Sequence, residues 1–287
     1  MKTVATHDGR FHKDEIFAVA ILKIIYPNIK VIRSRDPEIF SKADIRVDVG
    51  LKYNPKTNDF DHHQNEFNEK RENGVYYSSC GLIWKHFWKG VVESKEVALE
   101  LDGKLFQPID AEDNGINLYD SGPIKPYTLR EISRSFFPIF EDKEEINKAF
   151  MKVVDLAVNI IKNEINMISE IVKARTILKN KIEKSNEEYL VLDKYIPWKK
   201  YVIENTDLKY VVHPGHDKKW VVVAVPIKNG DYRCRKDFPR EWAGLVGEDL
   251  AKVTGVKDAY FCHKSRFIVS TKTKEGAIKI VKLALKK

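Results

Sequence analysis

The sequence predicts an α/β fold in two domains, and three observations support this prediction. The chain has 287 residues, which suits two domains of ordinary size. Over the first 120 residues, short apolar runs alternate with helical stretches, the pattern of a mainly parallel sheet flanked by helices. A long helical stretch then leads to a second, smaller α/β pattern.

The first predicted domain covers residues 1–185. Short apolar runs predict strands at residues 2–6, 30–35 and 45–49. Helical periodicity predicts helices at residues 12–26 and 78–92 and in a stretch that ends near Asp110. Residues 12–26 are apolar on nearly every side, so we expect that helix to be buried.

A long connector and a smaller domain follow. From residue 143 to about 185, apolar residues lie close to one helical stripe without Pro or Gly, which predicts one helix or two. The boundary near 185 leaves a second domain of residues 186–287. Its predicted strands are residues 189–192, 210–213, 220–226 and 266–270. A last helix covers residues 274–286, with Thr273 at its N-cap.

The composition excludes several protein classes. Hydrophobic residues make up 43% and charged residues 32%, as in a folded soluble chain. No run approaches the roughly 18 apolar residues that span a bilayer, and the N-terminus lacks a secretory signal. Three widely spaced cysteines indicate neither a disulfide framework nor a cysteine zinc site. We therefore expect a cytoplasmic protein without membrane contact. The composition does not determine the oligomeric state, and a dimer is one possibility.

The net charge of +8 lies in one segment. Residues 252–287 hold ten basic and two acidic residues, so the rest of the chain is neutral as a block. A basic segment of this kind suggests a polyanionic partner such as RNA, DNA or another phosphate ester. Taken alone, the charge favours the simpler interpretation of a lysine-rich solvated helix face.

Histidines and aspartates cluster at the predicted strand ends, where an open α/β sheet forms its ligand crevice. The clusters are His7, His12 and Asp14; Asp48; Asp61, His62 and His63; and Asp110 and Asp113. Imidazoles and carboxylates without thiolate suit manganese, iron, magnesium or zinc. One aspartate can bridge two ions about 3.5–4 Å apart, as in phosphoryl displacement. Each residue alone fits a turn or a cap, but their joint occurrence favours a metal site.

These motifs carry a family resemblance. Asp61–His62–His63, with the upstream His–Asp motif and Asp48, resembles the DHH phosphoesterase superfamily. The segments THDGRFHKDE, DVG, DHHQNEF, SSCGLIWKHF and DAEDNGI resemble the melanocyte-proliferating-gene exonuclease family more closely. The resemblance continues through RKDFPREWAGL and AYFCHKSRFIVSTKTKEGA and so covers most of the chain.

The resemblance implies a phosphodiesterase site with two divalent ions, manganese first, with magnesium, iron or zinc as alternatives. The implied ligands are His7, His12, Asp14, Asp48, His62 and Asp110, and Asp113 is a close rival of Asp110. His63 would lie over the scissile phosphate as a donor or acid, and Asp61 would orient it. His12 stands where the superfamily usually has Asp, which shifts preference away from magnesium.

The resemblance also implies that the C-terminal domain holds substrate. Candidate phosphate contacts are Arg235, His263, Arg266 and Lys272. Plain surface charge explains Arg266 and Lys272 equally well, and RFIVSTKT lacks the glycine pair that the closer family tends to have. At the start of the helix predicted at 78–92, Ser78, Ser79 and Gly81 could present N–H groups to an anion.

The first-choice function is a metal-dependent phosphodiesterase, a 3′→5′ exonuclease on RNA or short oligonucleotides that uses a two-metal-activated water. One alternative is a small-molecule phosphatase or phosphodiesterase acting on pyrophosphate, a nucleoside bisphosphate or a cyclic dinucleotide. A second alternative, from another class, is a non-catalytic nucleic-acid-binding protein with a structural metal.

Overall fold

The computed structural model describes residues 1–119, 122–139, 142–185 and 187–287 and confirms the mixed α/β class. These residues divide into an N-terminal unit, Met1–Ser169, and a C-terminal unit, Glu170–Lys287. The division falls inside a long helix, whereas the sequence places the domain boundary after it. Residue 186, where the second predicted domain begins, lies outside the described residues. The assignment of a catalytic and a substrate-binding domain stays a prediction.

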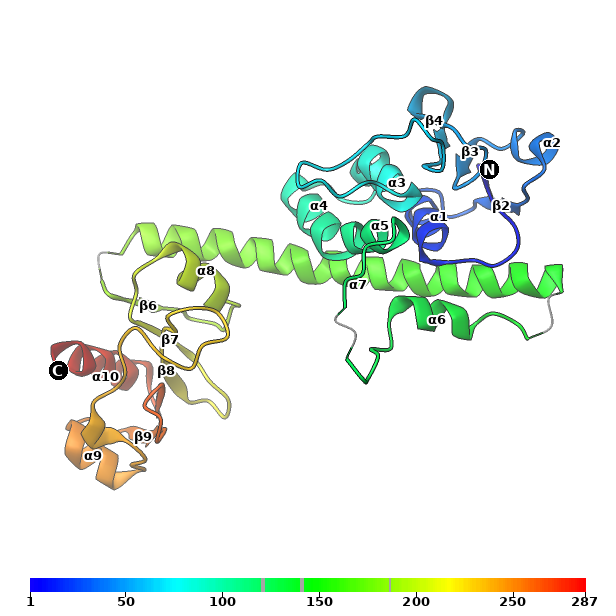
Figure 1. Ribbon diagram of the computed structural model, residues 1–287. Helices are drawn as coiled ribbons and strands as arrows, with labels where there is room; N and C mark the ends of the chain where they lie inside the picture. The colour runs from blue at the N-terminus through cyan, green and yellow to red at the C-terminus, as the bar shows by residue number, and fades with distance from the viewer. Residues whose placement is uncertain (120–121, 140–141, 186) are drawn as a thin grey trace. The chain divides into compact units, whose positions relative to one another are not determined.

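The sheet of the N-terminal unit has the order β2-β1-β3-β5-β4 (Figure 1). Its strands are β1 (Thr3–Thr6), β2 (Lys30–Arg33), β3 (Ile45–Val47), β4 (Tyr53–Asn54) and β5 (Asp59–Phe60). The β1, β2, β3 and β5 strands run parallel, and β4 pairs antiparallel with β5. Because the four parallel strands end at one edge, the residues that follow them are brought together.

The helices in this part of the chain lie beside the sheet or beside one another, and the last of them continues into the C-terminal unit (Figure 1). They are α1 (Lys13–Ile25), α2 (Pro37–Phe40), α3 (Ser79–Phe87), α4 (Lys95–Leu101), α5 (Gln107–Asp113), α6 (Leu129–Ser135) and α7 (Lys143–Glu183). Single turns are η1 (Pro55–Thr57), η2 (Trp88–Gly90) and η3 (Asp102–Phe106). The predicted burial of the first helix is confirmed, since every residue from Lys13 to Leu22 in α1 is buried. The connector is one continuous helix of 41 residues.

The sheet of the C-terminal unit has the order β6-β7-β8-β10-β9. Its strands are β6 (Tyr189–Val191), β7 (Tyr210–Pro214), β8 (Trp220–Ala224), β9 (Ala259–Cys262) and β10 (Ile268–Thr271). Its helices are α8 (Lys199–Asn205), η4 (Arg240–Trp242), α9 (Glu248–Thr254) and α10 (Lys274–Lys286). The predicted cap is confirmed, because Thr273 Oγ1 accepts a hydrogen bond from Gly276 N at 3.0 Å.

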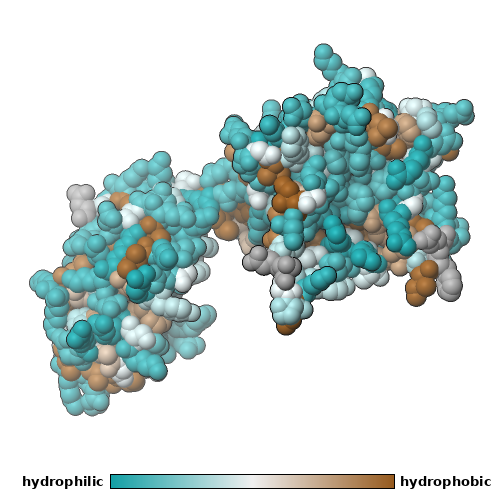
Figure 2. Space-filling view, viewed as in Figure 1, coloured by the Kyte–Doolittle hydropathy of each residue, from teal (hydrophilic) through white to brown (hydrophobic). Residues whose placement is uncertain are grey.

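The surface of both units is mainly hydrophilic in the view of Figure 2, with apolar groups in scattered patches. Among the described residues, no helix combines the length and the apolar character needed to cross a bilayer.

Candidate metal centre

Three of the predicted clusters follow parallel strands of the N-terminal sheet. His7 comes directly after β1, Asp48 after β3 and Asp61 after β5. Asp48 has a left-handed backbone, with φ of 54°, a conformation that Asp and Asn adopt more readily than most residues. All three side chains are buried at the same sheet edge.

A first group of possible ligands surrounds one oxygen of Asp48. Its Oδ2 lies 3.4 Å from His7 Nε2 and 3.7 Å from His12 Nε2. The two imidazole rings stack at 5.3 Å between centroids. One donor atom from each of these residues, together with one from Glu15, lies within 4.8 Å of the others.

Glu15 is a site residue that the sequence prediction missed. Its carboxylate lies 3.3 Å from His7 Nε2 and 3.0 Å from His12 Nδ1, and it also accepts a hydrogen bond from His12 N. The available signal was its place three residues after the N-cap His12 of α1, the spacing of a capping box. Glu15 thus fixes both imidazoles from the first turn of α1.

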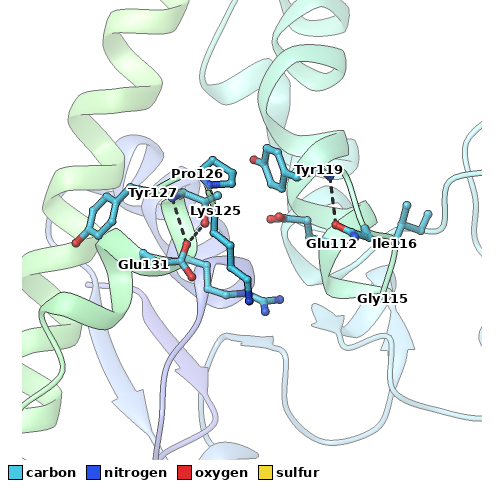
Figure 3. A pocket seen from close by; sticks show the side chains of 11 residues that line it. Glu112, Gly115, Ile116, Tyr119, Lys125, Pro126, Tyr127 and Glu131 are labelled. Atoms are coloured by element: carbon cyan, nitrogen blue, oxygen red, sulfur yellow. Dashed lines mark hydrogen bonds between the residues drawn. The ribbon is translucent and has the colours of Figure 1, made fainter. Parts of the chain in front are cut away.

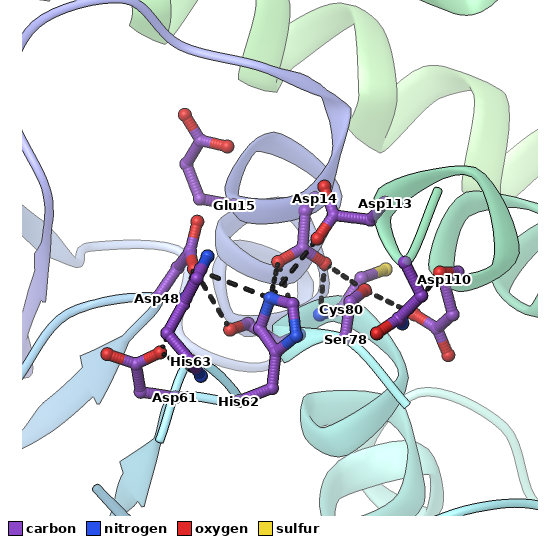
Figure 4. A network of polar contacts seen from close by, with 12 residues as sticks. Asp14, Glu15, Asp48, Asp61, His62, His63, Ser78, Cys80, Asp110 and Asp113 are labelled. Atoms are coloured by element: carbon purple, nitrogen blue, oxygen red, sulfur yellow. Dashed lines mark hydrogen bonds and ion pairs between the residues drawn. The ribbon is translucent and has the colours of Figure 1, made fainter. Parts of the chain in front are cut away.

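A second group lies on the other side of Asp48 (Figure 4). His62 Nε2 is 3.1 Å from Asp113 Oδ2, 3.8 Å from Asp14 Oδ2 and 3.8 Å from Asp48 Oδ1. Donor atoms of Asp14, His62 and Asp113 all lie within 4.8 Å of one another. Asp48 therefore presents one oxygen to each group, as a bridging carboxylate would.

Asp110 has a different environment from Asp113. Asp110 Oδ1 accepts hydrogen bonds from Ser78 Oγ at 2.6 Å and Gly81 N at 2.9 Å, and its Oδ2 pairs with Arg71 Nη1 at 2.6 Å. Burial raises the pKa of Asp110 to about 6, although Arg71 and these donors oppose the rise. Both oxygens of Asp110 are thus engaged, whereas Asp113 faces His62.

The N-terminal amides of α3 bind the chain's own carboxylates. Ser79 N and Cys80 N donate to Asp14 at 3.1 and 2.7 Å, as Gly81 N does to Asp110. The sequence suggested that N–H groups at the start of this helix could bind an anion. In the structure, the anions that they bind are the carboxylates of Asp14 and Asp110. Burial raises the pKa of the Cys80 thiol well above its usual range, so this cysteine is a neutral neighbour.

Gly81 is required by this close approach. A Cβ at Gly81 would lie 1.8 Å from Asp110 Oδ2 and 2.8 Å from the Tyr77 ring. We expect Gly81→Ala to lower the free energy of unfolding by at least about 1–3 kcal/mol, the usual cost of overpacking. The matched control is Gly103→Ala, where a Cβ meets nothing within 4 Å. Urea unfolding of the two variants checks this, and equal stabilities would contradict it.

Asp61 holds His63 at the mouth of the cluster. Asp61 Oδ2 accepts from Leu51 N at 2.8 Å, and its Oδ1 accepts from His63 N at 3.1 Å and from His63 Nδ1 at 2.8 Å. Asp48 and Asp61 together raise the pKa of His63 to about 10. The His63 side chain is 53% exposed. Because Nδ1 faces both Asp61 and Asp48, at 2.8 and 3.3 Å, His63 can offer Nε2 to a bound group.

The donor set fits divalent cations. His7 Nε2, His62 Nε2 and Asp48 Oδ2 are buried and make no hydrogen bond to the described residues. Burial lowers the pKa of His7, but Asp48 and Glu15 outweigh it and raise this pKa to about 10. The cluster therefore stabilises positive charge. Nitrogen and carboxylate ligands of this kind suit manganese, iron or zinc.

A cleft of about 460 Å³ opens onto this cluster. His7, His12, Asp48, Asp61 and His63 line it on the cluster side. Arg35, Phe40 and Leu51 are among the residues of the other wall. A phosphoester in this cleft would contact the exposed side chains of His63 and His12.

In the C-terminal unit, Arg235 and His263 contact their own chain. Arg235 donates to Leu208 O at 3.0 Å and to Ile203 O at 2.7 Å, which ties two backbone segments together. His263 lies in the turn after β9, and its ring is 4.5 Å from that of Phe267. His263 Nδ1 accepts from Ser265 N.

Arg266 lies in the same turn as His263 but donates to Phe238 O at 3.1 Å and pairs with Asp237 at 3.0 Å. Lys272 is exposed and follows β10, at the opposite end of that strand from Arg266. His263 and Arg266 are thus brought together, and Lys272 is separated from them. A substrate-binding role for these residues stays a prediction.

Comparison with known proteins identifies the family of the chain. The family model MYG1_exonuc, described as "Uncharacterised protein family (UPF0160)", matches residues 3–285. A MYG1 protein from Schizosaccharomyces pombe is 32% identical over 317 residues, covering 98% of this chain and 97% of that protein. The MYG1 exonuclease of Mus musculus is 28% identical over 320 residues, covering 98% and 84%.

Among solved structures, RecJ in complex with Mn²⁺ from Thermus thermophilus shares 13% sequence identity at a TM-score of 0.28. This likeness covers 100% of this chain and 52% of that one, and it is too distant to bear on function. The family match instead identifies the family of the chain, because it covers residues 3–285, and every motif quoted above lies within that range. The resemblance stated from the sequence is confirmed, and the chain belongs to the MYG1 exonuclease family.

Proposed function

We propose that this protein is a metal-dependent phosphodiesterase with two divalent ions, manganese first. The observation that carries the proposal is Asp48, whose two oxygens face separate groups of histidines and carboxylates. His7, His12 and Asp48 would hold one ion, with Glu15 beside them. Asp14, Asp48, His62 and Asp113 would hold the other. Asp113 replaces Asp110 in this ligand set, because Asp113 Oδ2 lies 3.1 Å from His62 Nε2, whereas Asp110 is ion-paired with Arg71.

When bound, the ions would activate the attacking water and offset charge on the phosphate oxygens. The chain's own residues would do the rest. Glu15 and the α3 amides keep the ligands in place. Asp61 holds the His63 ring so that Nε2 can donate a proton to the leaving oxygen.

For the substrate, we propose RNA or a short oligonucleotide cleaved from its 3′ end. Mammalian relatives are named MYG1 exonuclease, which supports a nuclease. The basic 252–287 segment supports a polyanionic substrate. A cytoplasmic location is proposed with it, as expected from the sequence. Cleavage of 5′- and 3′-labelled RNA and DNA oligonucleotides with Mn²⁺ tests it. Hydrolysis of pyrophosphate or a nucleoside bisphosphate alone would favour the small-molecule alternative.

His63→Asn should lower the turnover number by about 10²–10⁴-fold, the usual contribution of a general acid. Bound manganese should stay at the wild-type level, because in this proposal His63 Nδ1 is held by Asp61 and Asp48 and its Nε2 serves the substrate. The matched control is His86→Asn. In the wild-type protein, His86 Nε2 contacts Tyr53 OH. Loss of metal from His63→Asn, measured by elemental analysis, would instead make His63 a ligand.

A further inference from the structure

A second groove lies beside the metal centre in the N-terminal unit. It has a volume of about 600 Å³ and is bounded by the end of α5 and the segment that leads into α6 (Figure 3). Glu112 lines the groove, and the adjacent Asp113 faces His62. The groove therefore begins one residue from a proposed metal ligand. Its volume is within the roughly 300–1,000 Å³ of small-ligand sites.

The groove combines exposed aromatic rings with basic side chains. Tyr119 is 44% exposed and Tyr127 is 71% exposed. Lys125 and Arg130 are exposed and line the same groove, and neither forms an ion pair with another described residue. Rings that stack on bases, next to cations that meet phosphates, are the usual means of binding single-stranded nucleic acid.

The two acidic residues of the groove are already engaged. Glu112 pairs with the buried Lys13 at the start of α1. Glu131 accepts hydrogen bonds from Thr128 N and Oγ1 as the N3 residue of a capping box at α6. Lys13 offsets the charge of Glu112, whereas Glu131 stays ionised. Because the groove carries both Lys125 and Arg130, it still offers a small net positive charge to a ligand.

We propose that this tyrosine groove (Glu112, Ile116, Tyr119, Lys125, Tyr127 and Arg130) binds the part of a single-stranded nucleic acid that extends from the scissile phosphate. The inference rests on the proposed function and adds a substrate-binding surface within the catalytic unit itself. Tyr119 and Tyr127 stack on bases, and Lys125 and Arg130 contact the phosphates. Because every base has a stacking face, the groove selects single strands with little base preference.

The test uses the full-length protein in EDTA and a fluorescein-labelled RNA of about 12 nucleotides, with binding followed by anisotropy. Tyr119→Ala and Tyr127→Ala should each weaken binding about tenfold, the size of one lost stacking contact. Tyr232→Ala, at a 97% exposed tyrosine of the C-terminal unit, is the matched control and should bind like wild type. Wild-type affinity in both groove variants would overturn the proposal, as would the absence of RNA binding by the wild-type protein.

The charges are tested by the salt dependence of the same binding. Lys125→Ala and Arg130→Ala should each reduce the log–log salt slope by about 0.7, and Lys56→Ala, at another exposed lysine, should not. Hydrolysis of bis-p-nitrophenyl phosphate by the wild-type protein tests the metal centre by itself. If wild type hydrolyses this diester but the groove variants keep wild-type RNA affinity and slope, the groove proposal fails and the proposed function stands. If wild type hydrolyses no phosphodiester, the proposed function fails. If the groove binds only a protein partner, the salt slopes of RNA binding are the same in the variants as in wild type, and the groove proposal fails.

Discussion

Asp48→Asn should remove nearly all phosphodiesterase activity from a protein that still folds. Asparagine keeps the shape of the side chain and tolerates the left-handed backbone at this position, φ 54°, so the sheet edge is preserved. The charge shared by both groups of ligands is lost. Metal ions stabilise such transition states by several kcal/mol, which corresponds to about 10³-fold in rate.

The control for this variant is Asp44→Asn. Asp44 precedes β3, and Asp48 follows it; Asp44 accepts hydrogen bonds from Thr3 N and Oγ1 at the other end of β1. We expect Asp44→Asn to keep wild-type turnover. Steady-state cleavage of a labelled oligonucleotide at saturating Mn²⁺ measures both variants. Near wild-type turnover in Asp48→Asn would remove the basis for the two-ion proposal.

Asp113→Asn and Asp110→Asn should have opposite effects on metal binding and folding. Asp113 faces His62. The pKa of Asp14 is raised first by its own burial and next by the charge of Asp113. Its loss should weaken metal binding more than about 100-fold, beyond the 10–100-fold of residues that only support ligands. Stability without metal should change little, because the relieved repulsion with the buried Asp14 offsets the lost contact with His62.

Asp110→Asn should instead destabilise the fold. It removes the charge that pairs with Arg71 in a buried network, a change that costs about 3–5 kcal/mol. Because Asp102 also pairs with Arg71, we expect the lower end of that range. Urea unfolding in EDTA and isothermal titration with Mn²⁺ separate the two effects. Metal loss in Asp110→Asn with a normal free energy of unfolding would restore Asp110 as the ligand.

The choice between these two aspartates shows where the sequence stops being informative. Both lie on α5, three residues apart, so helical periodicity places them on similar faces. What separates them is Arg71, a loop residue that contacts Asp110 from 39 positions away. A contact of that kind has no local sequence signal. The sequence could predict the motif residues before α1 and after β3, because the carboxyl ends of parallel strands meet at one edge of the sheet whatever side chains follow them.

Other gaps between sequence and structure have similar physical causes. The two-residue strands β4 and β5 are too short to show alternation, although β5 positions Asp61. Glu15 was missed because a capping-box glutamate is also a common local feature. In the C-terminal unit, Arg235 is an unremarkable basic residue in the sequence, and only the fold shows that its guanidinium donates to backbone carbonyls.

The most direct measurement is a titration of metal-stripped protein with Mn²⁺ in which bound metal and oligonucleotide cleavage are followed together. If Asp48 joins two ion sites, each chain should bind two equivalents, and cleavage should rise to its maximum only as the second is taken up. In Asp113→Asn, one equivalent should bind at the His7, His12 and Asp48 group without restoring cleavage. Maximal cleavage after a single equivalent, or cleavage without any bound metal, would contradict the account.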